Sequence, residues 1–245
     1  MIKTENGYAH IYKIYGRSET EIKERLEDVL KKDVAAYVAT RCCGKEVHVL
    51  AEIAIQDADE AKETLKPLHK EIKKALGSMV YSTKENETLE EAVVRLLVKY
   101  ELTVTTAESC TGGMIASKLV NVAGVSDVFN EGFITYSNKA KRKILGVNKN
   151  TLKKYGAVSE QTVREMAVGG VFAADADACV AVSGIAGPDG GTDEKPVGLV
   201  YIGCCVKDDV VVKECHFDGT RMEVREQSAN AALDLLRTAI LNHYR

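Results

Sequence analysis

The sequence Leu102-Thr103-Val104-Thr105-Thr106-Ala107-Glu108-Ser109-Cys110-Thr111-Gly112-Gly113 decides the fold of the larger part of this chain. Its first half, Leu102 to Ala107, is apolar and β-branched, which predicts a buried strand. A turn with two glycines follows directly, and a helix is predicted over Gly112 to Val120. A strand that leads straight into a helix is the repeating unit of layered α/β domains.

The same alternation continues from this stretch to the C-terminus. The other predicted strands are Val128 to Tyr136, Ala178 to Ile185, Val197 to Val206 and Val210 to Phe217, and the other predicted helices are Asn138 to Leu145, Glu160 to Ala173 and Arg221 to Leu241. This pattern predicts a layered α/β/α domain. The last three strands follow one another with short turns and no helix, so part of the sheet is predicted to be antiparallel and the sheet mixed.

Upstream, residues 7 to about 78 predict a small α+β unit of the order β-α-β-β-α. The predicted elements are a strand at Tyr8 to Tyr15, a helix that begins at the capping box Ser18 to Glu21, strands around Ala35 to Thr40 and Glu46 to Ile55, and a helix from about Ala58 to Leu76. A polar segment at residues 82–87 follows. The sequence therefore predicts two domains, at residues 1–80 and 81–245.

Composition excludes several classes of protein. The 245 residues carry a formal net charge of -3, so no strong field attracts nucleic acid or an anionic membrane. No apolar run reaches the roughly 18 residues that a membrane-spanning helix needs. The seven cysteines form no C-x-x-C motif and the five histidines are scattered, so we expect reduced thiols, no metal site and a cytoplasmic protein.

Ser109 stands at the predicted strand-to-helix turn, where a nucleophile would be exposed. Amide groups at the start of a helix can hold a phosphate or a developing oxyanion, and Gly112 and Gly113 let the backbone approach a ligand closely. A helix cap by Ser109 or Thr111 explains the same residues about equally well. From these residues alone both interpretations stay open.

Lys141 is the candidate base for such a serine, in the segment Thr135-Tyr136-Ser137-Asn138-Lys139-Ala140-Lys141. Tyr136 ends a predicted strand, and Asn138 is the expected cap of the helix that carries Lys141. A buried lysine of lowered pKa can deprotonate a serine, and a tyrosine can relay or orient the proton. A solvated basic helix is the alternative, and these residues alone favour it.

Two further segments combine features of ligand-binding loops. Residues 183–198, SGIAGPDGGTDEKPVG, contain five glycines and two of the three prolines, directly after a predicted buried strand. In the segment 217–225, Arg221 and Arg225 are four apart on a predicted helix and could clamp an anion together. A tight crossover loop and simple surface ion pairing with Glu223 and Glu226 are the competing explanations.

Taken in order, these segments closely resemble the C-terminal domain of the CinA family (competence/damage-inducible proteins), the nicotinamide-mononucleotide deamidase or PncC-type amidohydrolase. The resemblance rests on TAESCTGG at 106–113, TYSNKAK at 135–141, YGAVSEQTV at 155–163, the 183–198 loop, and FDGTR with Arg225. It covers about residues 88–242. Residues 7–78 also resemble the small KH-type domain that precedes the deamidase in this family.

The resemblance implies hydrolysis of the carboxamide of nicotinamide mononucleotide to nicotinate mononucleotide and ammonia, without a cofactor. Ser109, Tyr136 and Lys141 are the expected catalytic residues: serine as nucleophile, lysine as base, tyrosine as proton relay. The expected substrate-binding residues are Glu108, Cys110, Thr111, Gly112, Gly113, Asn138, Gly187, Asp189, Gly190, Gly191, Thr192 and Arg221. The phosphate is expected among the Gly112 and Gly113 amides, the Gly187 to Thr192 loop and Arg221.

The chain also departs from the family pattern. Full-length members begin with a molybdopterin-binding-like domain associated with ADP-ribose pyrophosphatase activity, which this sequence lacks, so we expect no pyrophosphatase activity from it; a naturally split protein and a fragment both fit. The KH-type unit has no Gly-x-x-Gly loop and balances 14 Lys/Arg against 14 Asp/Glu in residues 1–80, which argues against RNA binding. A homo-oligomer, such as a dimer, is the expected assembly, and a non-catalytic nucleotide-binding or scaffold protein linked to competence or DNA repair is the alternative function.

Overall fold

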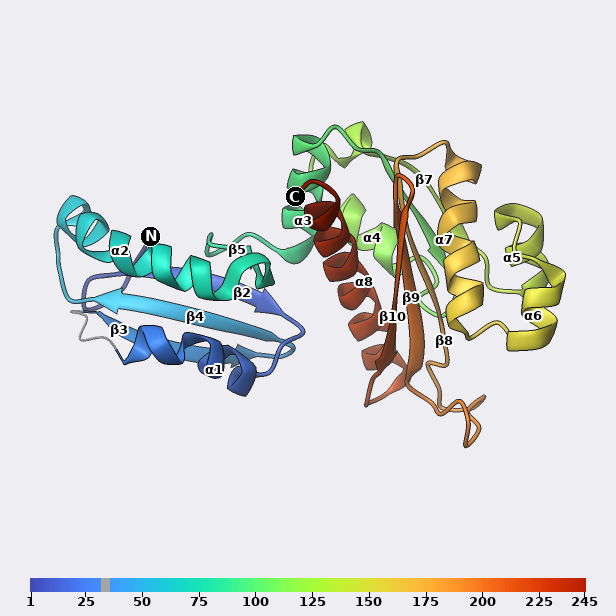
Figure 1. Cartoon of the computed structure of the whole chain (residues 1–245), viewed down its shortest axis with the longest axis horizontal. Coiled ribbons are helices and arrows are strands. Elements are labelled where there is room, and N and C mark those ends of the chain that lie inside the picture. The colour runs from blue at the N-terminus through green and yellow to red at the C-terminus, as the bar shows by residue number, and fades with distance from the viewer. Residues whose placement is uncertain (32–35) are drawn as a thin grey trace. The chain divides into compact units, whose positions relative to one another are not determined.

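The computed structural model describes residues 1–31 and 36–245, and these divide into two compact units, Met1–Thr88 and Leu89–Arg245 (Figure 1). Each unit has its own sheet. The two units are therefore described separately.

The N-terminal unit is an antiparallel sheet with two helices. Its elements are β1 (Ile2–Lys3), β2 (Tyr8–Tyr15), α1 (Glu19–Leu30), β3 (Tyr37–Cys43), β4 (Glu46–Ile53), α2 (Ala58–Leu76), a 3-10 turn (Gly77–Met79) and β5 (Val80–Ser82). The strand order is β1-β2-β4-β3, with β5 also paired to β2. The Ser18 hydroxyl accepts the Glu21 amide at 3.1 Å and begins α1, as the capping motif predicts.

One face of this sheet packs against both helices. Alternate residues of β2 and β4, including Tyr12, Ile14 and Val49, are buried with Leu26 of α1 and Leu65 of α2 in one apolar core. The β-α-β-β-α core of the prediction is confirmed, while the short edge strands β1 and β5 were not predicted. The predicted strand around Ala35 to Thr40 is found from Tyr37 on, and Ala35 lies outside the described residues.

The C-terminal unit is a layered α/β/α domain with a mixed sheet of order β10-β9-β8-β6-β7. Its elements are α3 (Leu89–Lys99), β6 (Val104–Glu108), α4 (Met114–Val120), a 3-10 turn (Val125–Asp127), β7 (Phe129–Ile134), α5 (Asn138–Leu145), α6 (Lys149–Tyr155), α7 (Glu160–Ala174), β8 (Ala178–Gly184), β9 (Leu199–Val206), β10 (Asp209–His216) and α8 (Arg221–His243). β6 is parallel to β7 and β8, whereas β9 is antiparallel to both of its neighbours, β8 and β10. The mixed sheet is confirmed.

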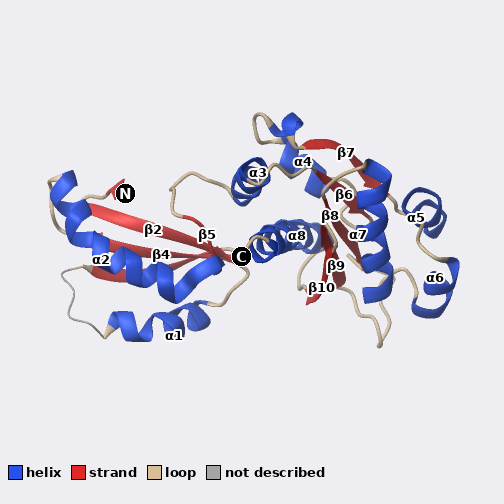
Figure 2. Cartoon of the chain, turned by 45° about the horizontal axis from the view of Figure 1, so that its top comes forward, coloured by secondary structure: helices blue, strands red, loops and turns tan. Residues whose placement is uncertain are grey.

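Helices cover both faces of this sheet (Figure 2). α3, α4 and α8 lie on one face, and α7 lies on the other with α5 and α6 outside it. The central strand β8 is therefore buried on both faces: Cys179 and Ala181 pack toward α7, while Val180 and Val182 are equally buried on the opposite face. At Gly169 of α7 a Cβ would stand 1.8 Å from the Leu145 carbonyl oxygen, so this glycine lets α7 approach α5 closely.

Three details of the C-terminal unit differ from the prediction. The helix α6 was not predicted, because its short polar sequence KNTLKKY has a single buried residue, Leu152. The helix predicted from Gly112 begins at Met114, since Gly112 and Gly113 both have positive φ. The turn predicted between β8 and β9 is a long loop over residues 185–198, and only the β9–β10 connection is tight.

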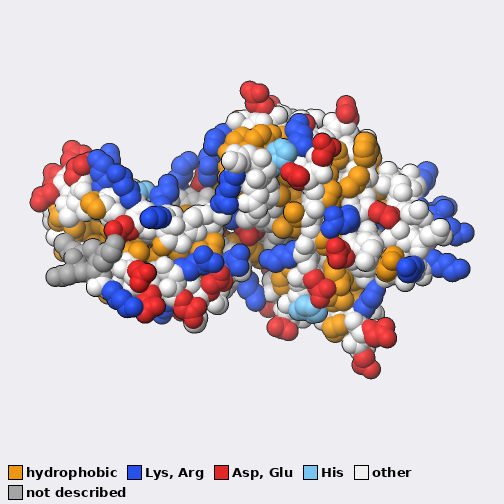
Figure 3. All heavy atoms as spheres, in the orientation of Figure 1, with side chains coloured by type: hydrophobic (Ala, Val, Ile, Leu, Met, Phe, Trp, Pro, Cys, Tyr) orange, Lys and Arg blue, Asp and Glu red, His pale blue; other side chains and the backbone are white. Residues whose placement is uncertain are grey.

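Over the described residues, no helix is long and apolar enough to cross a membrane. All seven cysteines are free thiols, and the described part of the chain contains no cluster of three or more metal-ligating side chains. On the face shown in Figure 3, acidic and basic side chains are interspersed over each unit.

Candidate active site

Three parallel strands of the C-terminal unit, β6, β7 and β8, end at the same edge of the sheet. Glu108, the last residue of β6, is paired with Ile134 of β7 and Val182 of β8. The ladder continues one step further, because the Ser109 amide donates to the Val182 carbonyl (3.0 Å) and the Thr135 amide donates to the Glu108 carbonyl (2.8 Å). Ligand sites of α/β sheets form outside the carboxyl ends of strands, which is where Ser109 lies.

Ser109 and Lys141 are in direct contact at this edge. The Lys141 Nζ donates a hydrogen bond of 3.0 Å to the Ser109 Oγ. Ser109 directly follows β6, and Lys141 lies in the first turn of α5, which the Ser137 hydroxyl caps by accepting the Ala140 amide at 3.1 Å. The structure thus brings together a serine and a lysine from separate elements, with 0% of Lys141 and 8% of Ser109 exposed.

Burial shifts the Lys141 amine toward its neutral form. Burial lowers the pKa of Lys141 from 10.5 to about 8, and the nearby Cys110 opposes this only partly. The Nζ also donates to the carbonyl oxygens of Thr135 (2.8 Å) and Tyr136 (3.5 Å). A neutral amine has two hydrogens and one lone pair, so two carbonyl acceptors leave the lone pair for the serine hydroxyl. This geometry suits a general base.

Glu108 caps the helix that follows the serine. Its buried carboxylate accepts the amides of Gly113 (2.9 Å), Ile115 (3.2 Å) and Ala116 (2.9 Å), so it takes up the N-terminal amides of α4. The alternative interpretation, in which Ser109 or Thr111 caps this helix, is therefore wrong. The Gly112 and Gly113 amides, which were expected to contact the phosphate, both have partners within the protein: the Gly112 amide donates to the Ser109 carbonyl at 3.1 Å and the Gly113 amide to Glu108 at 2.9 Å.

The amides of Cys110 and Thr111 differ from those of the glycines. Among the described residues, neither donates to a protein oxygen, and both N–H groups act on the Cys110 sulfur. Burial raises the pKa of the Cys110 thiol to about 11, and these two amides and the Lys141 amine work against that rise. The two N–H groups and the amine thus create a positive potential at the Cys110 sulfur, one residue after Ser109, where negative charge would be stabilised.

Tyr136 lies at the surface of the site. Its side chain is 62% exposed, and its hydroxyl accepts a hydrogen bond from the Arg221 Nη2 at 3.3 Å. The Arg221 Nη1 donates to the Gly187 carbonyl at 2.6 Å. The structure therefore joins Tyr136, Arg221 and Gly187 in one group, and among the described residues no hydrogen bond links the Tyr136 hydroxyl to Ser109 or Lys141.

The two ends of the loop over residues 185–198 are joined by the Gly198 amide, which donates to the Ile185 carbonyl at 2.8 Å. Gly187 precedes a cis peptide bond to Pro188. The Lys195 Nζ donates to the carbonyls of Tyr155 and Val158, both at 2.7 Å, and fixes the loop against the segment before α7. Sequence reasoning missed this role of Lys195, which only the long-range contact shows.

The other predicted substrate-binding residues lie apart from the Ser109–Lys141 contact. Asp189, Gly190, Gly191 and Thr192 are exposed at the tip of the loop. Asn138 is the exposed first residue of α5, and the cap predicted for it is Ser137 instead. None of these five side chains or backbone groups bonds to Ser109 or Lys141 in the described structure.

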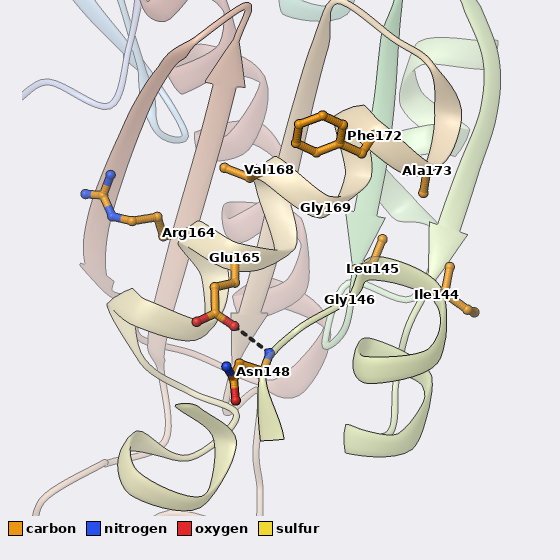
Figure 4. A pocket seen from close by; sticks show the side chains of 10 residues that line it. All are labelled: Ile144, Leu145, Gly146, Asn148, Arg164, Glu165, Val168, Gly169, Phe172 and Ala173. Atoms are coloured by element: carbon orange, nitrogen blue, oxygen red, sulfur yellow. Dashed lines mark hydrogen bonds between the residues drawn. The ribbon is translucent and has the colours of Figure 1, made fainter. Parts of the chain in front are cut away.

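A cavity of the C-terminal unit lies elsewhere, between α5 and α7. It measures about 760 Å³ and is lined by residues of these helices and the following turn, including Ile144, Val168 and Phe172 (Figure 4). The Glu165 carboxylate accepts the Asn148 amide at 2.7 Å at its rim. Ser109, Tyr136 and Lys141 do not line it, so it is separate from the candidate site.

The chain matches two family models. The CinA C-terminal domain matches residues 86–240, and the KH domain of the damage-inducible protein CinA matches residues 9–82. The chain is 46% identical over 235 residues to a protein of Clostridium beijerinckii and 44% identical over 234 residues to a CinA-like protein of Kosmotoga olearia. It covers 57% of the length of each of these relatives, and they cover 95% and 96% of this chain.

Solved structures match the C-terminal unit over almost their whole length. The competence/damage-inducible protein CihA of Agrobacterium tumefaciens is 42% identical, with a TM-score of 0.59, and covers 64% of this chain and 99% of its own. The competence damage-inducible protein A of Klebsiella pneumoniae is 38% identical, with a TM-score of 0.62, and the match covers 64% of this chain and 97% of the Klebsiella chain.

Proposed function

The chain belongs to the CinA family, and on that premise we propose that its C-terminal unit is a metal-independent amidohydrolase that deamidates nicotinamide mononucleotide. The family supports the substrate class, because it includes the PncC-type deamidases that the sequence motifs resemble. The site supports the reaction type. The observation that carries the proposal is the 3.0 Å contact between the buried Lys141 amine and the Ser109 hydroxyl.

The first half of the proposed reaction forms an ester on the enzyme. Ser109 Oγ attacks the carboxamide carbon while its proton passes to the neutral Lys141 amine. The carbonyl oxygen of the substrate becomes an oxyanion beside the Cys110 and Thr111 amides. Lys141 then returns the proton to the amide nitrogen, the C–N bond breaks, and ammonia leaves.

The second half repeats these steps with water. Lys141 takes a proton from a water molecule, which attacks the ester carbon. The tetrahedral intermediate collapses, the C–O bond to Ser109 breaks, and the proton returns from Lys141 to the serine oxygen. The product is nicotinate mononucleotide, and the enzyme is regenerated without a metal or a cofactor in any step.

The group formed by Tyr136, Arg221 and Gly187 is the proposed binding wall for the nucleotide. The exposed phenol ring can pack on the pyridinium, because aromatic faces attract cationic rings. The Arg221 guanidinium supplies a positive charge near the opening, suited to the phosphate. Tyr136 is thus proposed as a binding residue in place of a proton relay.

The decisive experiment is ammonia release from nicotinamide mononucleotide in the presence of a chelator. We expect turnover by the wild type and a loss of at least about a thousandfold for Ser109→Ala and Lys141→Met, since each removes a member of the reacting pair. Arg164→Ala, which changes an exposed arginine of α7 outside this site, is the matched control and keeps full activity.

The two variants also separate the proposal from its alternative. Ser109→Ala is expected to bind the mononucleotide with nearly unchanged affinity, because the serine acts mainly in the chemical step. If the folded wild type binds the mononucleotide but releases no ammonia, the C-terminal unit is a nucleotide-binding domain and the amidohydrolase proposal is wrong.

A further inference from the structure

Arg225 of α8 contacts the backbone of the turn that follows Ser109. Its Nε donates to the Cys110 carbonyl at 3.1 Å, and its Nη2 donates to the Thr111 carbonyl at 2.8 Å. Two successive peptide groups are therefore held by one guanidinium that lies more than a hundred residues away in the chain. The surface ion pairing considered for this arginine is absent: no described carboxylate lies within 4.0 Å of Arg225, and the Glu223 carboxylate accepts the amide of the α8 N-cap Thr220 instead.

The direction of these contacts affects the amides on the other side of each peptide group. In a trans peptide the carbonyl and the N–H point in opposite directions, so a cation at the Cys110 oxygen stands behind the Thr111 N–H. Charge-assisted hydrogen bonds to the carbonyl withdraw electron density from the peptide nitrogen. The Thr111 N–H therefore becomes a stronger donor toward the site.

The second contact reaches the Cys110 N–H through a short chain of hydrogen bonds. Arg225 binds the Thr111 carbonyl, which belongs to the same peptide group as the Gly112 N–H. The Gly112 N–H donates to the Ser109 carbonyl at 3.1 Å. The Ser109 carbonyl in turn belongs to the same peptide group as the Cys110 N–H. Successive hydrogen bonds polarise one another, so the guanidinium makes both the Cys110 and the Thr111 N–H stronger donors.

We propose that Arg225 is a positioning residue for the oxyanion site: its guanidinium fixes and polarises the turn so that the Cys110 and Thr111 amides receive the negative charge formed at Ser109. The assignment rests on the proposed function for the reaction and on the two carbonyl contacts for the residue. The opposing effect of both amides on the pKa of Cys110 supports it, because a thiolate and an oxyanion respond to the same potential.

A phosphate-binding role for Arg225 predicts a different kinetic result. An anion clamp stabilises substrate and transition state alike, so its loss raises KM. A polarised oxyanion site acts only when charge develops, so its loss lowers kcat. We expect Arg225→Ala to lower kcat by about ten- to a hundredfold, somewhat less than the loss of a direct oxyanion donor, with KM changed less than about threefold.

Two further variants test whether charge and shape both matter. Arg225→Lys retains the charge without the fork that binds two carbonyls, and it is expected to recover only part of the lost kcat. Guanidinium ion added to Arg225→Ala is expected to restore kcat partly, which a merely structural defect would not show. Arg164→Ala is the matched control, since Arg164 also donates from a helix to a backbone carbonyl (Val210, 3.3 Å).

The rate of Ser109 sulfonylation by phenylmethanesulfonyl fluoride, followed by mass spectrometry, gives a readout that does not need the proposed substrate. The sulfonyl oxygens gain negative charge as Ser109 attacks, so Arg225→Ala should react at least about tenfold more slowly than the wild type. If the wild type does not deamidate the mononucleotide but shows this difference, the proposed substrate is wrong and the role of Arg225 stands. Equal labelling rates, no labelling of wild-type Ser109, or a defect of Arg225→Ala confined to KM would overturn the assignment.

Discussion

The Lys141 Nζ lies within 3.5 Å of three oxygen atoms while its side chain has no contact with solvent. Two of these oxygens are the backbone carbonyls of Thr135 and Tyr136, which no side-chain substitution removes. The position of the amine is therefore set by the end of β7 and the start of α5. A base held in this way needs no histidine or carboxylate partner for its orientation.

The lowered pKa of Lys141 predicts the pH dependence of the proposed reaction. The base must be neutral, so kcat/KM should fall about tenfold per pH unit below the pKa of about 8 and level off above it. The measurement is kcat/KM for ammonia release between pH 6 and 10 at constant ionic strength. A rate that keeps rising to pH 10 would mean that the lysine titrates near its ordinary 10.5 and that burial has not shifted it.

At the residue scale, sequence motifs could predict the reacting pair but not every role around it. Ser109 and Lys141 were both expected at the site, and the structure places them 3.0 Å apart, although their catalytic roles stay a prediction. Tyr136 was expected beside them because it is close in sequence. Its backbone carbonyl does approach Lys141, but the side chain points to Arg221, and sequence proximity does not distinguish these two cases.

The helix α4 depends on the carboxylate of a strand residue. Glu108 belongs to β6, yet it binds three amides at the start of α4 and so fixes the angle between strand and helix around Ser109. The sequence did not reveal this contact. Capping motifs place the cap next to the helix, whereas the loop of residues 109–113 separates Glu108 from the start of α4 at Met114.

Glu108→Gln is expected to lower the free energy of unfolding by about 2–3 kcal/mol. The amide side chain removes the negative charge and turns one acceptor into a donor that faces buried N–H groups. Urea denaturation of the C-terminal unit measures the loss. Glu160→Gln, an exposed acid in the first turn of α7, is the control and should change stability by less than about 0.5 kcal/mol. A loss for Glu108→Gln as small as that of the control would show that the cap contributes little.

At the scale of elements, long periodic helices and apolar strands were predicted well, and short or irregular segments were not. α2 was expected over Ala58 to Leu76 and is found there, because its apolar residues recur at helical spacing between an Asp57 cap and Gly77. α6 and the edge strands bury few residues, so their sequences carry little periodic signal. The conformation of the loop 185–198 depends on long-range contacts such as that of Lys195 with Tyr155, 40 residues away, which local sequence patterns do not reveal.

Every residue of the candidate site lies in the unit Leu89–Arg245. Ser109, Lys141, Arg221 and Arg225 contact one another or the same loops, and solved relatives consist almost entirely of this unit. All five strands of the sheet and all residues of the buried cluster around α7 belong to this unit.

A chain of residues 84–245 is therefore expected to fold and to keep kcat/KM for the mononucleotide within about threefold of the full chain. The measurement is ammonia release together with thermal unfolding of both chains, and residues 1–83 serve as the inactive control. A folded C-terminal chain that has lost more than about tenfold would show that the N-terminal unit contributes to the site.

The burial of Lys141 has a consequence for chemical labelling. Amines of low pKa usually react fastest with acylating reagents at neutral pH, since more of the nucleophilic free base is present. Here the free base is enclosed by protein, so the native chain should leave this lysine unmodified while the exposed lysines beside it on α5, Lys139 and Lys143, react. Lys141 would then be acylated only when α5 separates from the sheet edge. The rate of its acylation therefore measures how often the site opens.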